Sequence, residues 1–366
     1  MNDEVVHGGN VYAAAEELGR PIGSLRDFSA SINALGPSPK AIRVLVKAAN
    51  LIHHYPDPDC TSLKRAVACQ WKLSPDQFVV GNGSSELIDL IPRTLSLRSA
   101  LVVGPTYGEY ARAVHRAGGR VSMVFARKEE RYRPPLEEVT HKLAAQRSAR
   151  AGIDSVFICH PNSPTGQPCR LDELAGLLRI ANRANVWVIV DESFIDYCGA
   201  LTCVPQLASF PRLIILRSFT KFYGLPGLRI GYSLSSRTVA ELLKQSQPPW
   251  SVNVLAQRAA HAALCDRDHA RRSLAYTLQE RSRLVERLSS VPDLTVIPSA
   301  ANFLLLELPG RILARTIAAR LRRQGMLIRD CSSIVGCSHR TIRIAVRTKN
   351  ENDRLLAALE QLLGES

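Results

Sequence analysis

The chain has 366 residues, more than one ordinary hydrophobic core accommodates, which predicts a large domain with a smaller one. Hydrophobic residues make up 46% and charged residues 22%, the balance of a globular protein. No apolar stretch approaches the roughly 20 residues that span a bilayer, so we expect no membrane partner.

Positive charge is the most unusual property of the composition. Lysine and arginine number 47 against 33 aspartate and glutamate residues, a formal net charge of +14. Such a charge is compatible with nucleic-acid binding, but the arginines are spread from Arg20 to Arg354 and form no basic run interleaved with aromatic residues. We therefore expect a solvated basic surface with a pocket for anionic small molecules, and no nucleic-acid partner.

The cysteines and the N-terminus predict a cytoplasmic location. The segment 1–10 contains two acidic residues and no basic region, unlike a signal peptide. The nine cysteines are scattered and form no Cys-x-x-Cys pair, so we interpret them as reduced thiols and expect no metal site.

From about residue 78 the chain alternates short apolar runs with helical patterns. Helices are expected at 84–95, after the glycine-rich turn 81–83, and at 171–182. Strands are expected at 78–80, 101–103, 121–124, 155–159, 186–190, 213–216 and 229–232. Such continuous β-branched runs separated by helices predict a parallel sheet covered on both faces.

After Trp250 the pattern changes to one that predicts a smaller α+β domain. One long helix is expected at 254–289, followed by strands at 294–297, 302–308, 326–329 and 341–346 and by helices at 312–324 and 351–363. The segment before residue 41 is expected to return to this domain. The predicted division is therefore 41–250 for the large domain, with 1–40 and 251–366 forming the small one.

The segment 217–229, Arg-Ser-Phe-Thr-Lys-Phe-Tyr-Gly-Leu-Pro-Gly-Leu-Arg, has the most informative pattern. Lys221 follows an apolar strand, with hydroxyls at Ser218 and Thr220 and a guanidinium at Arg229. These groups suit an aldehyde cofactor that bears a phosphate: the amine forms an imine, while hydroxyls and guanidinium hold the dianion. The alternative is a surface lysine in a polar loop.

Two earlier positions also follow expected strands. Asp191 ends a buried strand, where the carboxyl ends of parallel strands bind ligands, and an aspartate there can pair with a protonated pyridine nitrogen. A helix-capping aspartate is the alternative. Ser163 lies in the turn His-Pro-Asn-Ser-Pro-Thr-Gly at 160–166, which ordinary turn chemistry also explains.

Together these segments resemble the fold-type I pyridoxal-phosphate family, specifically the class I and II aminotransferases. The family pattern is an Asn-Pro-Thr-Gly turn, a strand-end aspartate, Ser-x-x-Lys and then Gly-x-Arg-x-Gly, and its order and spacing match most of this chain. The resemblance implies an α/β fold like that of aspartate aminotransferase, with a mostly parallel central sheet flanked by helices and a smaller α+β domain. It also implies pyridoxal 5'-phosphate as cofactor, attached to Lys221.

The resemblance assigns further roles. Gly83, Ser84 and Ser85 should bind the cofactor phosphate at a helix N-terminus. Tyr107 should stack on the pyridine ring, although by itself it could be a core aromatic. Tyr55 should reach the phosphate of the neighbouring subunit's cofactor, which implies a homodimer with shared sites. The implied cofactor and catalytic residues are Tyr55, Gly83, Ser84, Ser85, Tyr107, Ser163, Asp191, Ser218, Thr220, Lys221 and Arg229.

Two positions depart from the family pattern. Ser163 replaces the asparagine of Asn-Pro-Thr-Gly that contacts the cofactor's phenolate oxygen, and Phe194 replaces the tyrosine usually found three residues after the strand-end aspartate. Both changes remove or shorten hydrogen bonds to the O3' atom, so the imine pKa is expected to differ from that of a typical aminotransferase. The sequence leaves open whether Asn162 supplies the missing hydrogen bond to O3'.

Two branches of the family fit the chain: histidinol-phosphate aminotransferases and threonine-phosphate decarboxylases of cobalamin biosynthesis. The opening His-Gly-Gly-Asn at 7–10 and Asp-Phe-Ser-Ala-Ser-Ile-Asn-Ala-Leu-Gly at 27–36 resemble the decarboxylases, as do the segment 249–253 and Phe194. Histidinol-phosphate enzymes usually have an Asn-Glu-Asn-Pro type motif instead. Ala34 is a small departure, because the decarboxylases commonly have proline there.

The decarboxylase resemblance implies a phosphorylated amino acid as substrate, and hence several anion-binding groups. Arg329 and Arg343 match the family's substrate arginines, and guanidinium groups suit both a carboxylate and a phosphate. His7 and Asn33 are expected to close over the ligand. The first hypothesis is therefore a lyase, the second a transferase, and the third a binding protein that keeps the fold without the activity.

Overall fold

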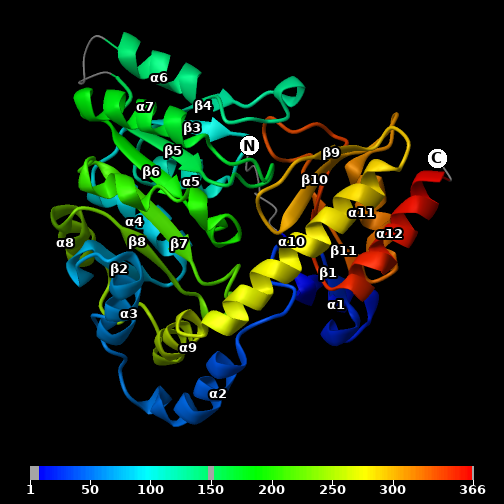
Figure 1. Ribbon diagram of the computed structural model, residues 1–366, viewed down its shortest axis with the longest axis horizontal. Helices are drawn as coiled ribbons and strands as arrows, with labels where there is room; N and C mark the ends of the chain where they lie inside the picture. Colours follow the sequence, from blue (N-terminus) through cyan, green and yellow to red (C-terminus); the bar gives the residue numbers. More distant parts are fainter. Residues whose placement is uncertain (1–7, 147–151, 365–366) are drawn as a thin grey trace.

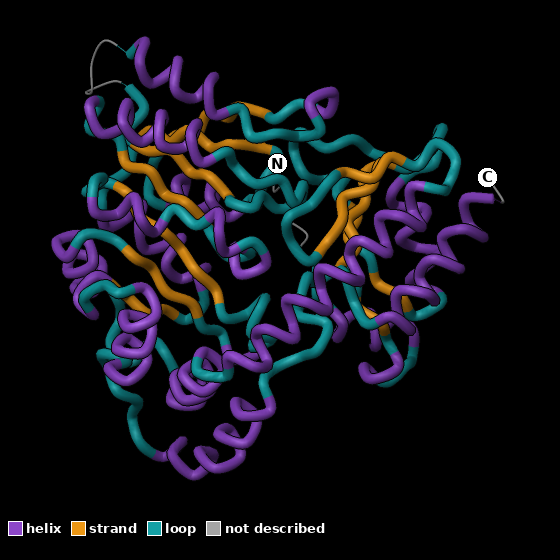
Figure 2. The backbone as a smooth tube through the Cα atoms, in the orientation of Figure 1, coloured by secondary structure: helices purple, strands orange, loops and turns teal. Residues whose placement is uncertain are grey.

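A seven-stranded sheet forms the centre of the larger part of the molecule (Figures 1 and 2). The computed structural model describes residues 8–146 and 152–364. In spatial order the strands are β2 (Phe78–Gly81), β8 (Gly231–Leu234), β7 (Leu213–Ser218), β6 (Trp187–Asp191), β5 (Ser155–Cys159), β3 (Ser99–Gly104) and β4 (Arg120–Phe125). Strands β4, β3, β5, β6 and β7 run parallel, whereas β8 is antiparallel to β7 and β2. The expected mostly parallel sheet is confirmed.

Alternate residues of each strand supply two separate cores. In β7, Leu213 and Ile215 belong to the core on one face, and Ile214 and Leu216 to the core on the other. All four are fully buried, and burying such a side chain contributes about 1.5–3 kcal/mol. A strand buried on both faces needs apolar residues at every position, which explains the continuous apolar runs.

Helices cover both faces of this sheet. One core takes residues from α3 (Thr61–Trp71), α6 (Leu136–Ala145), α7 (Leu171–Arg183) and α9 (Val254–Leu264). The other takes residues from α4 (Ser84–Thr94), α5 (Glu109–Arg116) and α8 (Arg237–Ser246). Helix α2 (Pro39–Ala48) packs mainly against α9.

A further core lies around a four-stranded antiparallel sheet, the second sheet, drawn mainly in orange and red in Figure 1. Its strands, in spatial order, are β12 (Arg329–Asp330), β13 (Thr341–Ala345), β10 (Phe303–Glu307) and β9 (Thr295–Ile297). Its helices are α10 (Arg267–Ser289), α11 (Ala314–Arg323) and α12 (Lys349–Gly364). No helix in the described part of the chain is long and apolar enough to cross a membrane.

The N-terminal segment lies beside this second sheet. Helix α1 (Val11–Leu18) precedes β1 (Arg26–Asp27), which pairs in parallel with β11 (Met326–Leu327), and Phe28 is part of the core around the four-stranded sheet. Short 3-10 turns complete the chain: η1 (Ile22–Ser24), η2 (Ala49–His53), η3 (Pro75–Gln77), η4 (Lys128–Glu130), η5 (Ile195–Tyr197), η6 (Gly199–Leu201), η7 (Val204–Ala208) and η8 (Pro226–Leu228).

The expectation of one helix over 254–289 is wrong. The chain leaves helical geometry at Asp266 (φ −90°, ψ 70°), which separates α9 from α10. The Asp266 carboxylate accepts a hydrogen bond from Ser38 Oγ (2.5 Å) and lies 3.3 Å from Lys40 Nζ. Contacts with a segment over 200 residues away therefore stabilise the break, which the local helical pattern does not reveal.

Two expected strands also differ from the structure. Strand β8 begins at Gly231 instead of 229, because Arg229 adopts a left-handed conformation (φ 56°) after η8. The run 326–329 splits between two sheets: β11 pairs with β1, whereas β12 pairs with β13.

The proposed domain division stays a prediction. Helix α9 follows residue 250, yet its alanines Ala256, Ala259, Ala260 and Ala263 lie in the core of the large sheet. Helix α10 runs from this helix to the second sheet (Figure 1). The change from one core to the other thus falls near Asp266.

Candidate active site

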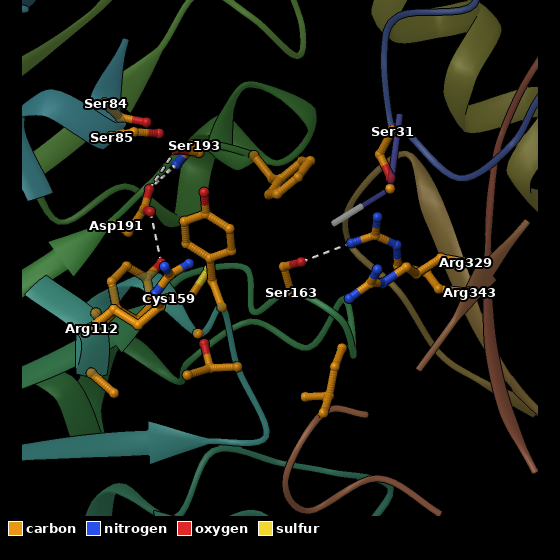
Figure 3. Close-up of a pocket in the computed structure, with 18 of the residues that line it drawn as sticks. Ser31, Ser84, Ser85, Arg112, Cys159, Ser163, Asp191, Ser193, Arg329 and Arg343 are labelled. Carbon is orange, nitrogen blue, oxygen red and sulfur yellow. Dashed lines mark hydrogen bonds between the residues drawn. The ribbon is translucent and has the colours of Figure 1, made fainter. Parts of the chain in front are cut away.

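A cavity of about 1050 Å³ lies where strands of the large sheet end and the second sheet approaches them. Asp191 ends β6, Cys159 ends β5, and Thr220 and Lys221 follow β7; all four line the cavity. From the second sheet, Arg329 and Arg343 line the opposite side (Figure 3). Parallel strands of one sheet end at the same edge, which explains why residues distant in sequence meet here.

Lys221 is half-buried in the cavity wall. Burial, together with the nearby positive charges of Arg343 and Arg229, lowers the pKa of its amine to about 8, while Asp191 opposes this shift. The Nζ atom lies 5.8 Å from the ring centre of Phe194. A larger fraction of this amine is therefore neutral near pH 7 than of an ordinary lysine, and the neutral amine is the nucleophilic form.

Asp191 is held by three hydrogen bonds. Ser193 donates to Oδ1 from its backbone N–H (2.9 Å) and its hydroxyl (2.5 Å), and the Tyr110 hydroxyl donates to Oδ2 (2.7 Å). Burial raises the pKa of the carboxyl, while the bonds from Ser193 and Tyr110 lower it. Because a carboxylate oxygen accepts two bonds, Oδ2 retains room for one more donor from the cavity.

The first turn of α4 and Arg229 form a pocket for an anion. Ser84 and Ser85 line the cavity at the start of α4, where backbone N–H groups lack helical partners. Gly83 precedes them at φ 80°, and a Cβ atom there would lie 2.6 Å from Arg229 Nη2. A Cβ on Gly231 would lie 2.6 Å from the Ser84 backbone nitrogen. Only glycine fits at either position, so the guanidinium can approach the helix N-terminus closely.

Hydroxyl groups extend this pocket towards Lys221. Thr220 lines the cavity, and its Oγ1 lies 2.7 Å from Ser218 Oγ. Ser218 is buried behind Thr220, and its Oγ also accepts from the Thr220 backbone N–H (3.2 Å). Ser218 therefore orients Thr220 and does not itself reach the cavity wall.

Tyr107 supplies an aromatic face to the cavity. Its ring meets that of Tyr110 edge-on at 5.6 Å, and burial raises the pKa of its hydroxyl. Tyr110 in turn stacks on Phe157, which is part of the sheet core. The position of Tyr107 is consistent with the expected stacking role.

Arg329 and Arg343 are directly opposite each other in the register of β12 and β13. Arg343 donates from Nη1 to Ser163 Oγ (2.9 Å) and from Nη2 to the Ser29 carbonyl (2.8 Å), and its guanidinium lies over the Phe303 ring. Neither arginine forms an ion pair within the described residues, and burial lowers the pKa of Arg343. Two neighbouring cations of this kind, one buried and one half-buried, suit an anionic ligand.

Asn162 does not take the place of the asparagine that the family has at position 163. Its amide donates to the Pro105 carbonyl (2.8 Å) and Thr165 Oγ1 (2.9 Å) and accepts from Thr106 Oγ1 (3.0 Å). The side chain is buried and is not part of the cavity wall. Asn162 thus joins two loops and does not substitute for the missing asparagine, whereas the Ser163 hydroxyl accepts from Arg343 and can still donate into the cavity.

Besides Gly83 and Ser218, two described residues expected at the site, Asn33 and Tyr55, are not in the cavity wall. The Asn33 amide is buried and is bonded to the Phe222 carbonyl (2.8 Å) and Ser273 Oγ (2.9 Å), so its expected contact with the ligand has no geometric support. Tyr55 is 80% exposed and packs on Trp250 at 4.7 Å. His7 lies outside the described residues.

Several residues that line the cavity were not among those expected from the sequence. Ser31 is 2% exposed, lines the cavity and has no hydrogen-bond partner for its hydroxyl, although Asn33 was chosen from the same segment. Tyr110 and Ser193 hold Asp191. Arg112 and His115 line the cavity from α5. The spacing of the last pair, three residues apart on an amphipathic helix, is the one pattern that could have indicated them.

The comparisons with known proteins agree with this geometry. Residues 25–359 match the family described as aminotransferase class I and II. The chain is 36% identical to a threonine-phosphate decarboxylase of Salmonella typhimurium over 98% of this chain and 96% of the relative, and 34% identical to a histidinol-phosphate aminotransferase of Anaeromyxobacter over 95% and 94%. A histidinol-phosphate aminotransferase of Sinorhizobium meliloti, solved with pyridoxal-5'-phosphate, has a TM-score of 0.87 at 26% identity, over 99% of this chain and 96% of that one.

The fold and the site define a pyridoxal-phosphate enzyme of fold type I. The chain belongs to the aminotransferase class I and II family, in the group that contains threonine-phosphate decarboxylases and histidinol-phosphate aminotransferases. Its cofactor is pyridoxal phosphate, and the residues present fit it. The glycine-lined turn at Gly83 suits a phosphate beside Arg229, and Asp191 can accept from a pyridine N–H.

Proposed function

We propose that the chain is a carboxy-lyase that converts L-threonine O-3-phosphate to (R)-1-amino-2-propanol O-2-phosphate, a step of cobalamin biosynthesis. The observation that carries the proposal is the pairing of Arg329 with Arg343 in one cavity with Lys221. A substrate with a carboxylate and a phosphate would supply anionic partners for these two arginines, which have none among the described residues. The Salmonella relative and the segments at 8–10 and 27–36 support the decarboxylase within the group.

The residue roles that we propose are those implied by the family resemblance, and the positions of these residues at the cavity support them. Gly83, Ser84, Ser85, Thr220 and Arg229 would hold the cofactor phosphate, with Ser218 orienting Thr220. Tyr107 would pack on the pyridine ring, and Ser163 would contact its phenolate oxygen. Asp191 would hold the pyridine nitrogen, and Lys221 the aldehyde carbon.

Bound there, pyridoxal phosphate supplies an electron sink for the bond at the substrate Cα that stands perpendicular to its ring. The protein therefore selects the reaction by orienting the substrate. Arg343 is fixed by Ser163 and Ser29 and offers a rigid guanidinium, while Arg329 lies opposite it. Anchoring the phosphate and the carboxylate on these groups would place the Cα–carboxylate bond in the reactive orientation.

Loss of the carboxylate as carbon dioxide requires a proton at Cα in its place. Lys221 is the cavity group best suited to supply it, because its pKa of about 8 leaves most of the amine protonated near pH 7 while keeping it a ready acid. Tyr107 also lines the cavity, but burial raises the pKa of its hydroxyl, which makes it the weaker acid.

The second candidate is a histidinol-phosphate aminotransferase. The Anaeromyxobacter relative and the Sinorhizobium structure support it, since the first matches the sequence and the second matches the fold over nearly the whole chain. Histidinol phosphate lacks a carboxylate, so one of the two arginines, Arg329 or Arg343, would be left without an anionic partner. Phe194, where the aminotransferases usually have tyrosine, also favours the decarboxylase.

The active unit is proposed to be a homodimer with shared sites. Exposed apolar side chains gather on α2, η2 and the following loop, namely Ile42, Val46, Ile52 and Tyr55. A second copy that covers this surface would remove apolar area from water. Tyr55 would then be available to the cofactor phosphate of the neighbouring subunit.

Product analysis with the two substrates side by side tests the proposal. Threonine phosphate should yield the amino alcohol phosphate without a keto-acid acceptor, and histidinol phosphate should react poorly even with 2-oxoglutarate. The reverse pattern would establish the aminotransferase and leave the cofactor assignment intact.

A further inference from the structure

Asn33 is bonded to the loop that carries Lys221. Its backbone N–H donates to the Lys221 carbonyl (3.1 Å), and its amide Nδ2 donates to the Phe222 carbonyl (2.8 Å) and to Ser273 Oγ on α10 (2.9 Å). Its Oδ1 accepts from the Leu35 backbone N–H (3.0 Å). Asn33 is 2% exposed, so these bonds are formed away from water, where losing one leaves a buried group unsatisfied.

We propose that Asn33 is a positioning residue for Lys221, which fixes where the amine lies by holding two successive carbonyls of its loop. The inference rests on the role proposed for Lys221 and not on which of the two reactions the enzyme performs.

The loop between β7 and η8 depends on such contacts, because it belongs to no helix or strand. Gly224 donates to the Lys221 carbonyl (3.3 Å), and Leu225 donates to the Phe219 carbonyl (3.2 Å). Gly224 (φ 67°) also lies against the N-terminal segment: a Cβ there would come within 2.8 Å of Gly36 and Pro37 backbone atoms. The segment around Asn33 therefore packs backbone against backbone on the Lys221 loop.

The same segment is attached to the substrate side of the cavity. Four residues before Asn33, the Ser29 carbonyl accepts from Arg343 Nη2 (2.8 Å), and Asp27 Oδ1 accepts from the Ser29 N–H and hydroxyl (2.8 and 2.6 Å). Ser31, which lies between Ser29 and Asn33 in the sequence, lines the cavity. One short stretch of chain thus connects Arg343 with the Lys221 backbone.

A shift of the Lys221 backbone would alter the surroundings of its amine. The charged groups that act on this amine are Asp191 from β6, Arg229 after η8 and Arg343 from β13. Moving the amine towards water would relieve its burial and the repulsion from the two arginines. Its proton affinity would then return towards that of an ordinary lysine.

The test uses full-length protein freed of cofactor, in wild-type form and as Asn33→Ala, Asn33→Ser and Ser273→Ala variants. Asn33→Ser retains an oxygen near the Leu35 N–H but cannot reach the Phe222 carbonyl. Ser273→Ala is the matched control, because it removes the bond of the same amide to α10 and leaves the Lys221 loop bonded. The rate at which each protein captures pyridoxal phosphate is followed by absorption as a function of pH, and borohydride trapping identifies the lysine.

For the wild type we expect a midpoint near pH 8. Both Asn33 variants should shift the midpoint upwards by about one unit, which slows capture roughly tenfold at neutral pH, whereas Ser273→Ala should match the wild type. Unchanged midpoints in Asn33 variants that unfold at the wild-type temperature would overturn the inference, as would an equal shift in Ser273→Ala. Trapping on a different lysine would instead refute the site assignment itself.

Discussion

Arg329 and Arg343 lie directly opposite each other on the antiparallel strands β12 and β13, and both side chains line the cavity. Like charges in this arrangement destabilise a sheet. Neither is neutralised by a carboxylate of the described residues, so the repulsion is retained in the free protein. Under the proposed function, the bound substrate supplies the negative charge that compensates this pair.

Replacing either arginine with alanine should lower kcat/KM about a hundredfold, on the order of 3 kcal/mol, because a substrate anion would be left unpaired in the cavity. Arg340→Ala is the matched control: this arginine lies near β13 but pairs with Glu307 outside the cavity, so its kcat/KM should stay within about twofold of the wild type. Steady-state kinetics on all three variants measure these changes in kcat/KM. Equal losses in all three would show that the arginines act only through the sheet.

The purified protein should be yellow, and Lys221→Ala should lose the absorption band of the lysine-bound cofactor. The physical reason is that Lys221 is the cavity amine beside Asp191 and the Arg229 pocket. Borohydride reduction followed by peptide mapping should find the pyridoxyl group on the peptide containing residue 221. A label on any other lysine would contradict the assignment.

The lowered pKa of Lys221 also predicts how stability varies with pH in the cofactor-free protein. Between about 8 and the ordinary lysine value of roughly 10.4 the unfolded chain binds more protons than the folded one, so stability rises with pH across this window. Lys221→Met should therefore have a higher melting temperature than the wild type at pH 7, and the difference should shrink at pH 10. Lys142→Met, a change at an exposed lysine of α6, serves as the control. A difference between Lys221→Met and wild type that does not change with pH would refute the prediction.

Sharing of sites predicts complementation between two damaged chains. Tyr55→Phe and Lys221→Ala homodimers contain only damaged sites, whereas a mixed dimer contains one intact site and one doubly damaged site. Mixing the two variants under conditions of subunit exchange should restore part of the activity. Sedimentation that shows an active monomer at assay concentration would rule out the shared site.

The residues that the sequence placed at the site are those at defined ends of regular elements. Asp191 and Lys221 follow strands of one parallel sheet, so their meeting could be inferred from sheet geometry and from the spacing of the family motif. Arg329 and Arg343 were expected at the site because they match the substrate arginines of the family, and they lie opposite each other on neighbouring strands. The meeting of Asp191 and Lys221 follows from the rule that parallel strands end together, whereas the roles of these residues and of the arginines came from the family resemblance.

The features that the sequence did not indicate depend on contacts between distant segments. The break at Asp266 is accompanied by bonds to Ser38 and Lys40, which the helical pattern of 254–289 cannot show. In the irregular stretch 29–33 no periodicity tells which side chain faces the cavity, so Asn33 was chosen where Ser31 lines the wall. Arg229 was assigned to a strand because its neighbours are apolar, although it turns into a left-handed conformation.

The most direct test of the central claim is the release of carbon dioxide from carboxyl-labelled L-threonine phosphate, with no keto acid present and Lys221→Ala as the blank. We predict rapid release of label with formation of 1-amino-2-propanol phosphate in equal amount, and none with the variant. Absence of labelled carbon dioxide, together with rapid 2-oxoglutarate-dependent conversion of histidinol phosphate, would contradict the decarboxylase proposal.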